Sequence, residues 1–188
     1  MHFENLVAFI FASLTLLTFG LSMRWFRDRK EVTPAKTRLV LSAYVCATVQ
    51  LLVIAFAPRP PAVCLGVGIG LYLLAQGVFW WARAAHGGQR PAFAGTTGRP
   101  TFLTQTGPYR VIRHPIYTAY LLAWLAGAVV AAQPWLLLTA GWMALLHYLA
   151  ARQEEGHFAE TPFAQDYEAY RRRTGMFLPS VRGLFRER

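Results

Sequence analysis

Five stretches of the chain contain no Asp, Glu, Lys or Arg and are apolar all round, which is typical of helices that cross a membrane. The hydrocarbon core of a bilayer needs about 17–25 such residues in a helix, and these stretches are 17 to 21 residues long. Together they hold 94 of the 188 residues, too large a share for the remaining chain to shield from water. We therefore predict an all-α polytopic membrane protein with five transmembrane helices. The stretches are Asn5–Met23, Leu39–Ala57, Ala62–Ala82, Ile116–Ala132 and Pro134–Ala151.

The basic residues lie almost entirely on one side of these predicted helices. That side holds 18 of the 19 Lys and Arg residues, and the other holds only Arg59 in the tight turn between the second and third helices. Because basic loops stay in the cytoplasm, we predict that the N-terminus faces outward and the C-terminus faces the cytoplasm. The residues concerned are Arg24, Arg27, Arg29, Lys30, Lys36, Arg38, Arg83, Arg90, Arg99, Arg110, Arg113, Arg152, Arg171, Arg172, Arg173, Arg182, Arg186 and Arg188.

The composition excludes several other classes of protein. A net charge of +10 would by itself suggest a soluble nucleic-acid-binding protein. Because the basic residues lie on one side of the predicted helices, the charge indicates membrane orientation instead, and we expect no nucleic acid partner. The two cysteines, Cys46 and Cys64, cannot form a disulfide scaffold. Glu154 and His157 form a single E-x-x-H pair with no second pair, so we expect no metal site. No glycine-rich phosphate loop follows a strand, so we expect no Rossmann domain.

We expect one integral membrane domain with its functional residues on the basic side. Four residues join the second helix to the third, and Gln133 alone joins the fourth to Pro134, so both connections predict antiparallel hairpins. Residues 1–82 then form a three-helix scaffold. The longer basic-side segments, Arg83–Pro115 and Arg152–Arg188, belong with the fourth and fifth helices to a functional part that spans residues 83–188.

Small and polar residues inside the predicted helices are expected to hold the helices together. Small residues let membrane helices approach closely, which favours packing for the Gly66–Gly70 stretch over a nucleotide loop. Three large polar side chains are expected to make interhelical hydrogen bonds rather than bind a ligand: Gln50, Gln76 and His147. The last two lie near the basic-side ends of their helices, where they could also form the floor of a site.

The segment Leu103–Tyr117 contains the first group of candidate functional residues. Pro115 fits the first position of the fourth helix, where its missing N–H is not needed. Arg113 and His114 would then lie beside free N–H groups at a helix N-terminus, where the helix dipole favours an anion. Tyr117 would add an aromatic wall to this pocket for a carboxylate or phosphate. The alternative is basic residues that snorkel to the interface beside a belt tyrosine.

The second group follows the fifth helix. Glu154 and Glu155 lie near a helix C-terminus, where acids oppose the helix dipole, and such broken local rules are typical of functional sites. They could accept hydrogen bonds from ribose hydroxyls or an ammonium group, or else pair with Arg113 or Arg152. A short C-terminal helix should then present one aromatic face, spaced as i, i+4 and i+7: Phe163, Tyr167 and Tyr170.

Together the two groups form a recognisable set of motifs. They are Gly107-Pro108-Tyr109, Arg113-His114-Pro115-x-Tyr117, Glu154-Glu155, Tyr167-x-x-Tyr170 and Pro179. This pattern, from about Leu103 to Pro179, resembles the isoprenylcysteine carboxyl methyltransferase and phospholipid methyltransferase superfamily. Ala119 and Ala164 stand where that superfamily often has Gly, and the acidic pair is about one residue further from Tyr167. The resemblance implies a membrane-embedded helical enzyme that uses S-adenosylmethionine without a Rossmann domain.

The resemblance also implies roles for individual residues. Arg113, His114 and Glu155 are the candidate catalytic residues, with Arg113 near the cofactor carboxylate or the acceptor. The segment Gly87–Pro100 has no counterpart in the pattern and is a candidate for acceptor recognition. The implied cofactor-binding residues are Gly107, Tyr109, Arg113, His114, Pro115, Tyr117, Glu154, Glu155, Tyr167 and Tyr170.

We thus expect methyl transfer from S-adenosylmethionine to a lipid or lipophilic acceptor at the cytoplasmic membrane face. An isoprenylcysteine-type carboxylate would need only neutralisation of its charge. A phospholipid amine or a thiol must lose a proton, so His114 or a glutamate would be a candidate base. Two alternatives remain open. One is an NADPH-dependent membrane reductase of the related sterol-reductase type, and the other is a non-enzymatic protein that binds anionic lipid through its basic face.

Overall fold

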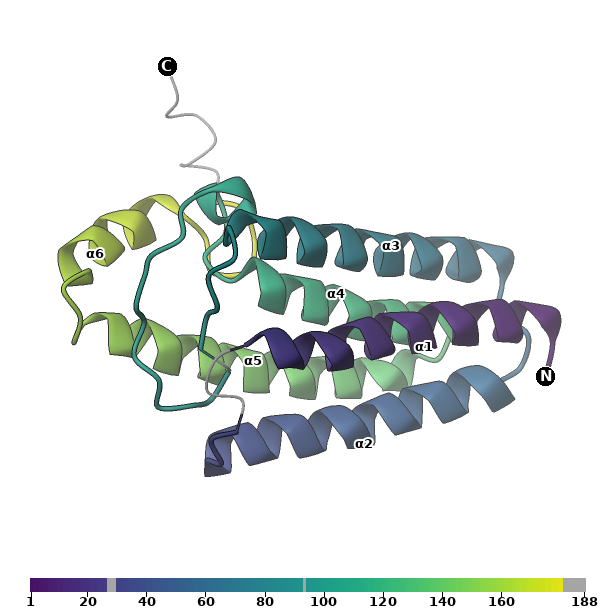
Figure 1. Cartoon of the computed structure of the whole chain (residues 1–188). Helices are drawn as coiled ribbons and strands as arrows, with labels where there is room; N and C mark the ends of the chain where they lie inside the picture. Colours follow the sequence, from purple (N-terminus) through teal and green to yellow (C-terminus); the bar gives the residue numbers. More distant parts are fainter. Residues whose placement is uncertain (27–29, 93, 181–188) are drawn as a thin grey trace, which may run out of the picture.

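A computed structural model of the chain describes residues 1–26, 30–92 and 94–180. Within these residues the fold is all-helical, as predicted, and an isolated β-bridge joins Ile112 to Gly175. Five long helices run side by side in alternating directions, and a sixth lies at one end of the bundle (Figure 1). The helices are α1 (Phe3–Ser22), α2 (Pro34–Phe56), α3 (Ala62–Ala85), α4 (Pro115–Val130), α5 (Leu137–Phe158) and α6 (Ala164–Arg173).

Four of the described helical segments are long and apolar enough to cross a membrane: Phe3–Trp25, Pro34–Phe56, Ala62–Ala85 and Pro134–Phe158. The fourth predicted span is shorter than expected. Helix α4 has 16 residues, because it ends at Val130 and the chain turns at Ala132, whose φ is +51°. The fifth predicted span is longer, since α5 continues through Glu154 and Glu155 to Phe158.

Proline and capping residues set several helix boundaries. Thr33 caps α2 by accepting a hydrogen bond from the Lys36 N–H, and Pro34 is the first residue of that helix. Pro115 begins α4, as the sequence predicts. Pro134 starts a short 3-10 turn (Pro134–Leu136) that leads into α5. Each proline stands where its backbone N–H would have had no partner within the helix.

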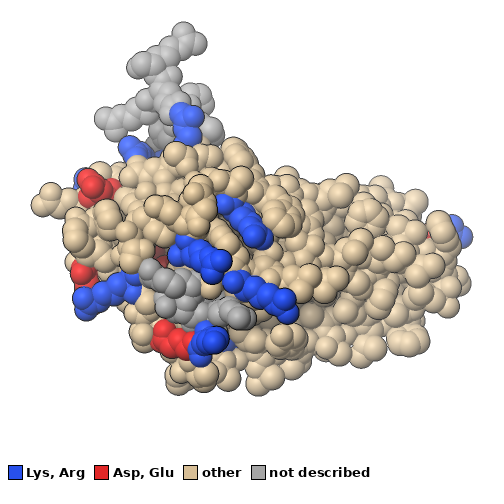
Figure 2. All heavy atoms as spheres, viewed as in Figure 1, with Lys and Arg blue, Asp and Glu red and all other residues tan. Residues whose placement is uncertain are grey.

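The connections on the predicted basic side all meet at one end of the bundle, which we call the α6 end (Figure 1). In the face that Figure 2 shows, charged side chains gather at this end, while the body of the bundle is almost free of them. At the opposite end, Arg59 pairs with Glu4 at 2.6 Å. Of the predicted basic residues, five lie outside the described residues: Arg27, Arg29, Arg182, Arg186 and Arg188.

Helices α3 and α4 pack closely through a glycine. A Cβ atom on Gly68 would lie 2.6 Å from the Cβ of Val130 and 2.8 Å from its backbone, whereas a Cβ on Gly66 or Gly70 would meet nothing within 4 Å. The packing interpretation of the Gly66–Gly70 stretch is therefore confirmed for Gly68 alone. This contact fixes α4 against α3 and so places the first residues of α4 beside the end of α3.

The three polar side chains inside the helices behave differently from one another. The Gln50 amide donates to the Trp124 carbonyl at 3.0 Å and to the Thr139 hydroxyl at 2.9 Å, which confirms the predicted interhelical bonds. His147 bonds within its own helix instead, to the Met143 carbonyl, so the interhelical prediction is wrong for this residue. The Oε1 atom of Gln76 is enclosed and has no hydrogen-bond partner among the described residues.

Candidate active site

The segment after α6 is bound to the segment that leads into α4. Backbone N–H groups of Arg113 and His114 donate to the carbonyls of Gly175 and Met176, at 2.8 and 3.0 Å. The Tyr170 hydroxyl donates to the Tyr109 carbonyl at 2.7 Å. The prediction that Arg113 and His114 lie at the start of α4 is correct. Their own N–H groups, however, are not free to bind an anion, because the returning chain occupies them.

Two carboxylates surround the side chain of His114. Oε1 of Glu155 accepts a hydrogen bond from Nε of Arg113 at 2.8 Å and lies 3.3 Å from Nε2 of His114. Oε2 of Glu154 accepts from the Tyr117 hydroxyl at 3.0 Å and lies 3.7 Å from Nδ1 of His114. The Arg113 and Glu155 side chains are only 10% and 7% exposed. The ion pair between Glu155 and Arg113, one of the two sequence alternatives, is thus present.

Arg113 is held from a second direction. Its Nη1 atom donates to the carbonyls of Thr174 and Arg171, at the end of α6. The guanidinium therefore connects the last turns of α5 to the end of α6. Because charge-assisted hydrogen bonds are about twice as strong as neutral ones, this connection holds His114 and Glu155 in a fixed arrangement.

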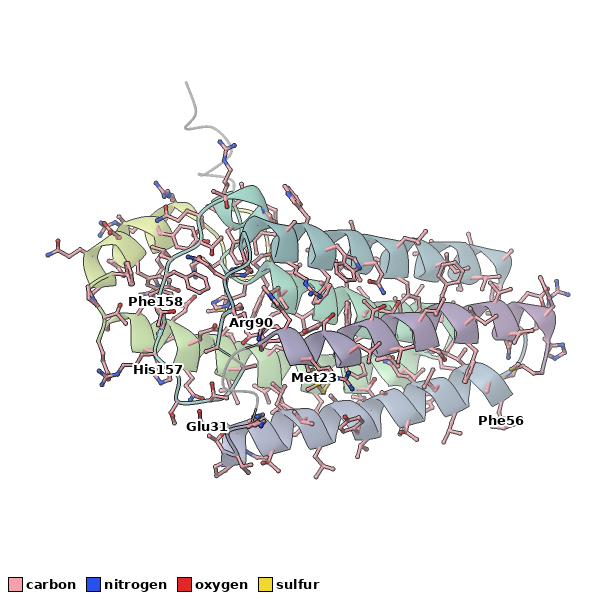
Figure 3. All side chains as sticks on the ribbon, viewed as in Figure 1. Met23, Glu31, Phe56, Arg90, His157 and Phe158 are labelled. Carbon is pink, nitrogen blue, oxygen red and sulfur yellow. The ribbon has the colours of Figure 1, made fainter. Side chains whose placement is uncertain are left out.

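Aromatic rings form the walls around these charged groups. The His114 and Tyr117 rings are parallel, with centres 5.3 Å apart, and Phe158 stacks on Tyr167 with centres 4.1 Å apart. Figure 3 shows Phe158 on the side of α5 that faces α6. Burial, and next the charge of Glu155, raise the pKa of Tyr167, so its hydroxyl stays protonated. That hydroxyl is enclosed and makes no hydrogen bond to the described residues.

His86, at the end of α3, is a site residue that the sequence does not single out. Its Nε2 atom lies 2.8 Å from the Tyr109 hydroxyl and its Nδ1 atom 3.1 Å from the Thr104 hydroxyl. Its ring packs against Trp25 and Phe102. Burial lowers the pKa of His86 to about 4. A lone histidine after an apolar stretch carries no motif, and its partners are 18 and 23 residues away.

Two cavities lie next to each other, one at the α6 end and the other extending from it into the helical bundle. The first, which we call the polar cavity, is lined by Arg113, His114, Glu154 and the aromatic rings around them, together with residues 91–92, 98 and 100–104. The second, which we call the apolar cavity, has a volume of about 200 Å³ and lies between α1, α2, α4 and α5. None of the described residues that line it is charged. Tyr117 and Phe26 line both cavities and so mark where they meet.

The polar cavity collects seven of the ten predicted cofactor-binding residues: Tyr109, Arg113, His114, Tyr117, Glu154, Tyr167 and Tyr170. The other three lie behind its wall. Gly107 adopts a φ of +58° in the turn before Tyr109, where a Cβ would lie 2.9 Å from that of Ala85. Pro115 starts α4, and Glu155 holds the side chains of Arg113 and His114 in place.

A family model described as phospholipid methyltransferase matches residues 63–166, more than half of the chain. The chain belongs to the phospholipid methyltransferase family. The match includes α3, α4 and α5 with the loops between them, so it covers most of the residues that line the polar cavity. No curated protein matches the chain.

Membership of the phospholipid methyltransferase family agrees with the superfamily to which the motifs point, and it implies methyltransferase activity in a membrane context. The four apolar helices that could cross a membrane agree with that context. The family match also includes the segment Gly87–Pro100, which the sequence analysis names as a candidate for acceptor recognition. Pro91 and Gly98 of this segment line the polar cavity, and Ala94 lines the apolar one.

Proposed function

We propose that this protein transfers a methyl group from S-adenosylmethionine to a lipid or lipophilic acceptor at the cytoplasmic face of the membrane. The observation that carries the proposal is the meeting of the polar and apolar cavities at Tyr117. A water-soluble charged cofactor and a lipophilic acceptor need chemically different sites that share a boundary. Holding two reactants across such a boundary is the main contribution a protein makes to a displacement reaction.

The residues of the polar cavity fit S-adenosylmethionine in chemical type. The cofactor supplies an electrophilic methyl group on a positively charged sulfur. Glu154 offers negative charge, and the rings of Tyr109 and Tyr117 offer faces that attract a cation.

We assign Arg113, His114 and Glu155 the catalytic roles. Glu155 orients the other two through the contacts at 2.8 and 3.3 Å, while Arg113 and His114 line the cavity itself. Gly107, Pro115 and Tyr170 belong to this assignment as residues that fix the backbone around Tyr109 and His114. Such a supporting layer keeps reacting groups within the small tolerance that efficient transfer requires.

The proposal includes five membrane crossings with the N-terminus outside and the α6 end in the cytoplasm. Helix α4 is about 24 Å long at 1.5 Å per residue, shorter than the roughly 30 Å hydrocarbon core. Local thinning of the bilayer accommodates such a mismatch at modest cost, and α4 is largely enclosed by its neighbours. The basic residues of the α6 end support the orientation.

Titration of the purified protein with S-adenosylmethionine and with its demethylated product tests this proposal. We expect both to bind, and we expect His114→Ala and Glu155→Ala to weaken binding at least about tenfold through loss of contacts in the polar cavity. Glu168→Ala is the matched control, because Glu168 lies on the exposed surface of α6 and its loss should leave binding unchanged. If the wild-type protein binds neither S-adenosylmethionine nor its demethylated product, or if all variants bind them equally well, the proposal is wrong.

A further inference from the structure

One buried histidine has a free ring nitrogen at the apolar cavity. His147 is 4% exposed and lines that cavity from α5. Its Nδ1 atom lies 2.7 Å from the Met143 carbonyl. Its Nε2 atom has no hydrogen-bond partner among the described residues. Three side-chain atoms of the described chain are fully enclosed and lack a partner: Asn5 Oδ1, Gln76 Oε1 and Tyr167 Oη. Nε2 of His147 is not one of them, so it is not fully enclosed. The Nε2 atom is therefore open to the cavity.

The contact with Met143 fixes the form of the imidazole. A carbonyl oxygen can only accept a hydrogen bond, so Nδ1 must carry the proton. In the neutral ring, Nε2 then presents its lone pair. A histidine whose one nitrogen is held by a backbone carbonyl is oriented for proton transfer at the other nitrogen.

Two tyrosine rings and a backbone carbonyl surround the imidazole of His147. The Tyr117 and Tyr120 rings have their centres 5.4 and 5.5 Å from the imidazole centre and hold it between α4 and the apolar cavity. The Met143 carbonyl points its negative end at Nδ1. Tyr117 is also the residue at which the two cavities meet, so His147 lies next to their boundary on the apolar side.

We propose that Nε2 of His147 accepts the proton released by the nucleophile of an apolar acceptor held in the apolar cavity. The inference rests on the proposed function and deepens it. A nitrogen or sulfur atom of the acceptor forms the new bond to the methyl carbon, and the bond from that carbon to the cofactor sulfur breaks, with its electron pair left on sulfur. The N–H or S–H proton moves to His147. The positive charge lost by the sulfur is thereby gained by the imidazole.

This role specifies the chemistry of the acceptor. Its nucleophile carries a proton, as in an amine or a thiol, and its body is apolar. A carboxylate acceptor has no proton to give to His147. Its bare negative charge would also be unfavourable in a cavity whose described lining carries no charged side chain.

The test uses the purified full-length chain and three acceptors of equal length: dodecanethiol, dodecylamine and dodecanoate. Two properties are measured for each acceptor: equilibrium binding without a methyl donor, and the rate of a single turnover with labelled S-adenosylmethionine. Binding of the demethylated cofactor is measured for every protein. The variants are His147→Gln, His147→Phe and the matched control His157→Gln. His157 lies on the same helix, on the side away from α6 (Figure 3), and lines neither cavity.

We expect the wild-type protein to methylate the thiol or the amine but not the carboxylate. Both His147 variants should lower the single-turnover rate about 100-fold or more, the usual contribution of a proton-transfer group. They should change acceptor binding less than about threefold, since the loss is confined to the transition state. His157→Gln should behave as the wild type.

Three results would overturn the inference. The first is an unchanged rate in the His147 variants, and the second is transfer to the carboxylate alone. The third is loss of both acceptor binding and demethylated-cofactor binding in both variants, which would make His147 a purely structural residue. Each leaves the proposed function standing as long as the wild-type protein binds the cofactor. Failure of the wild-type protein to bind the cofactor would instead contradict the proposed function itself.

Discussion

Among single residues, Glu155 supports the polar cavity most directly. Its carboxylate accepts from Arg113 and contacts His114, and it is almost completely buried. Glu155→Gln would leave the Arg113 charge without its anionic partner, and breaking a buried pair in this way typically destabilises a protein by about 3 kcal/mol. We expect a fall in the thermal unfolding temperature of roughly 6 °C or more in detergent.

Glu168→Gln is the matched control for this prediction. Glu168 pairs with Arg171 and Arg172 at 3.5 and 3.9 Å on the surface of α6, where its side chain is 51% exposed. Exposed pairs of this kind contribute less than about 1 kcal/mol. An equal fall in unfolding temperature for the two variants would contradict the central position assigned to Glu155.

His86 predicts a dependence of stability on pH. Its pKa is lowered from 6.5 to about 4 in the folded protein, so the unfolded chain takes up the proton first as the pH falls. The stabilisation is complete above pH 6.5. It is lost between pH 6.5 and about 4, by about 1.4 kcal/mol for each pH unit.

Unfolding of the wild type and of His86→Phe at pH 7.5 and pH 5 measures this effect. The variant should be less stable at pH 7.5, because the Tyr109 and Thr104 hydroxyls lose their partner. Its stability should nevertheless fall less between the two pH values, since the other titrating groups are unchanged. Equal pH dependence in the two proteins would show that another group is responsible.

At the scale of helices, the contact of α3 with α4 predicts a contrast between neighbouring glycines. Gly68→Ala would place a Cβ 2.6 Å from that of Val130, and such overpacking typically costs about 1–3 kcal/mol. Gly66→Ala and Gly70→Ala introduce the same atom into open space. We expect only Gly68→Ala to lower the unfolding temperature, and to weaken cofactor binding because α4 carries Tyr117. Equal behaviour of the three variants would contradict the packing described for α3 and α4.

The helices were largely predictable from the sequence because uncharged stretches and prolines mark them directly. Pro115 and Pro134 locate the starts of α4 and of the turn before α5. The length of α4 was not predictable, since Ala131 and Ala132 are apolar yet the chain turns there. The aromatic face of α6 followed from the spacing of Tyr167 and Tyr170, both of which are buried, whereas Phe163, the third residue predicted on this face, precedes the helix as its N-cap.

The site was predictable only where its residues lie close together in the sequence. Residues such as Arg113, His114 and Tyr117 lie close together in the chain and form a motif. His86 was not singled out, and His147 was named only as a possible floor of a site, because their roles depend on partners contributed by other segments and on a cavity that no local pattern reveals. The anchoring of the α4 start by Gly175 and Met176 likewise depends on the returning chain.

For the whole molecule, the charge distribution predicts an orientation that fusion reporters can test. A fluorescent protein that folds only in the cytoplasm should be bright when fused after Arg188, and a phosphatase active only outside should be active when inserted at Pro60. The positive-inside rule is the reason, since 18 of the 19 Lys and Arg residues belong to segments predicted on that side of the membrane. Reversal of both signals would place the polar cavity on the outer face.

The most direct test of methyl transfer at the junction of the two cavities is an assay with labelled S-adenosylmethionine. The purified protein is mixed with total membrane lipids or with lipophilic thiols and amines, and label is measured in the lipid phase. We predict that label appears there, and that His114→Ala reduces it at least about 100-fold while Glu168→Ala does not. Absence of label with every acceptor, from a protein that is folded and binds the cofactor, would contradict the proposed function.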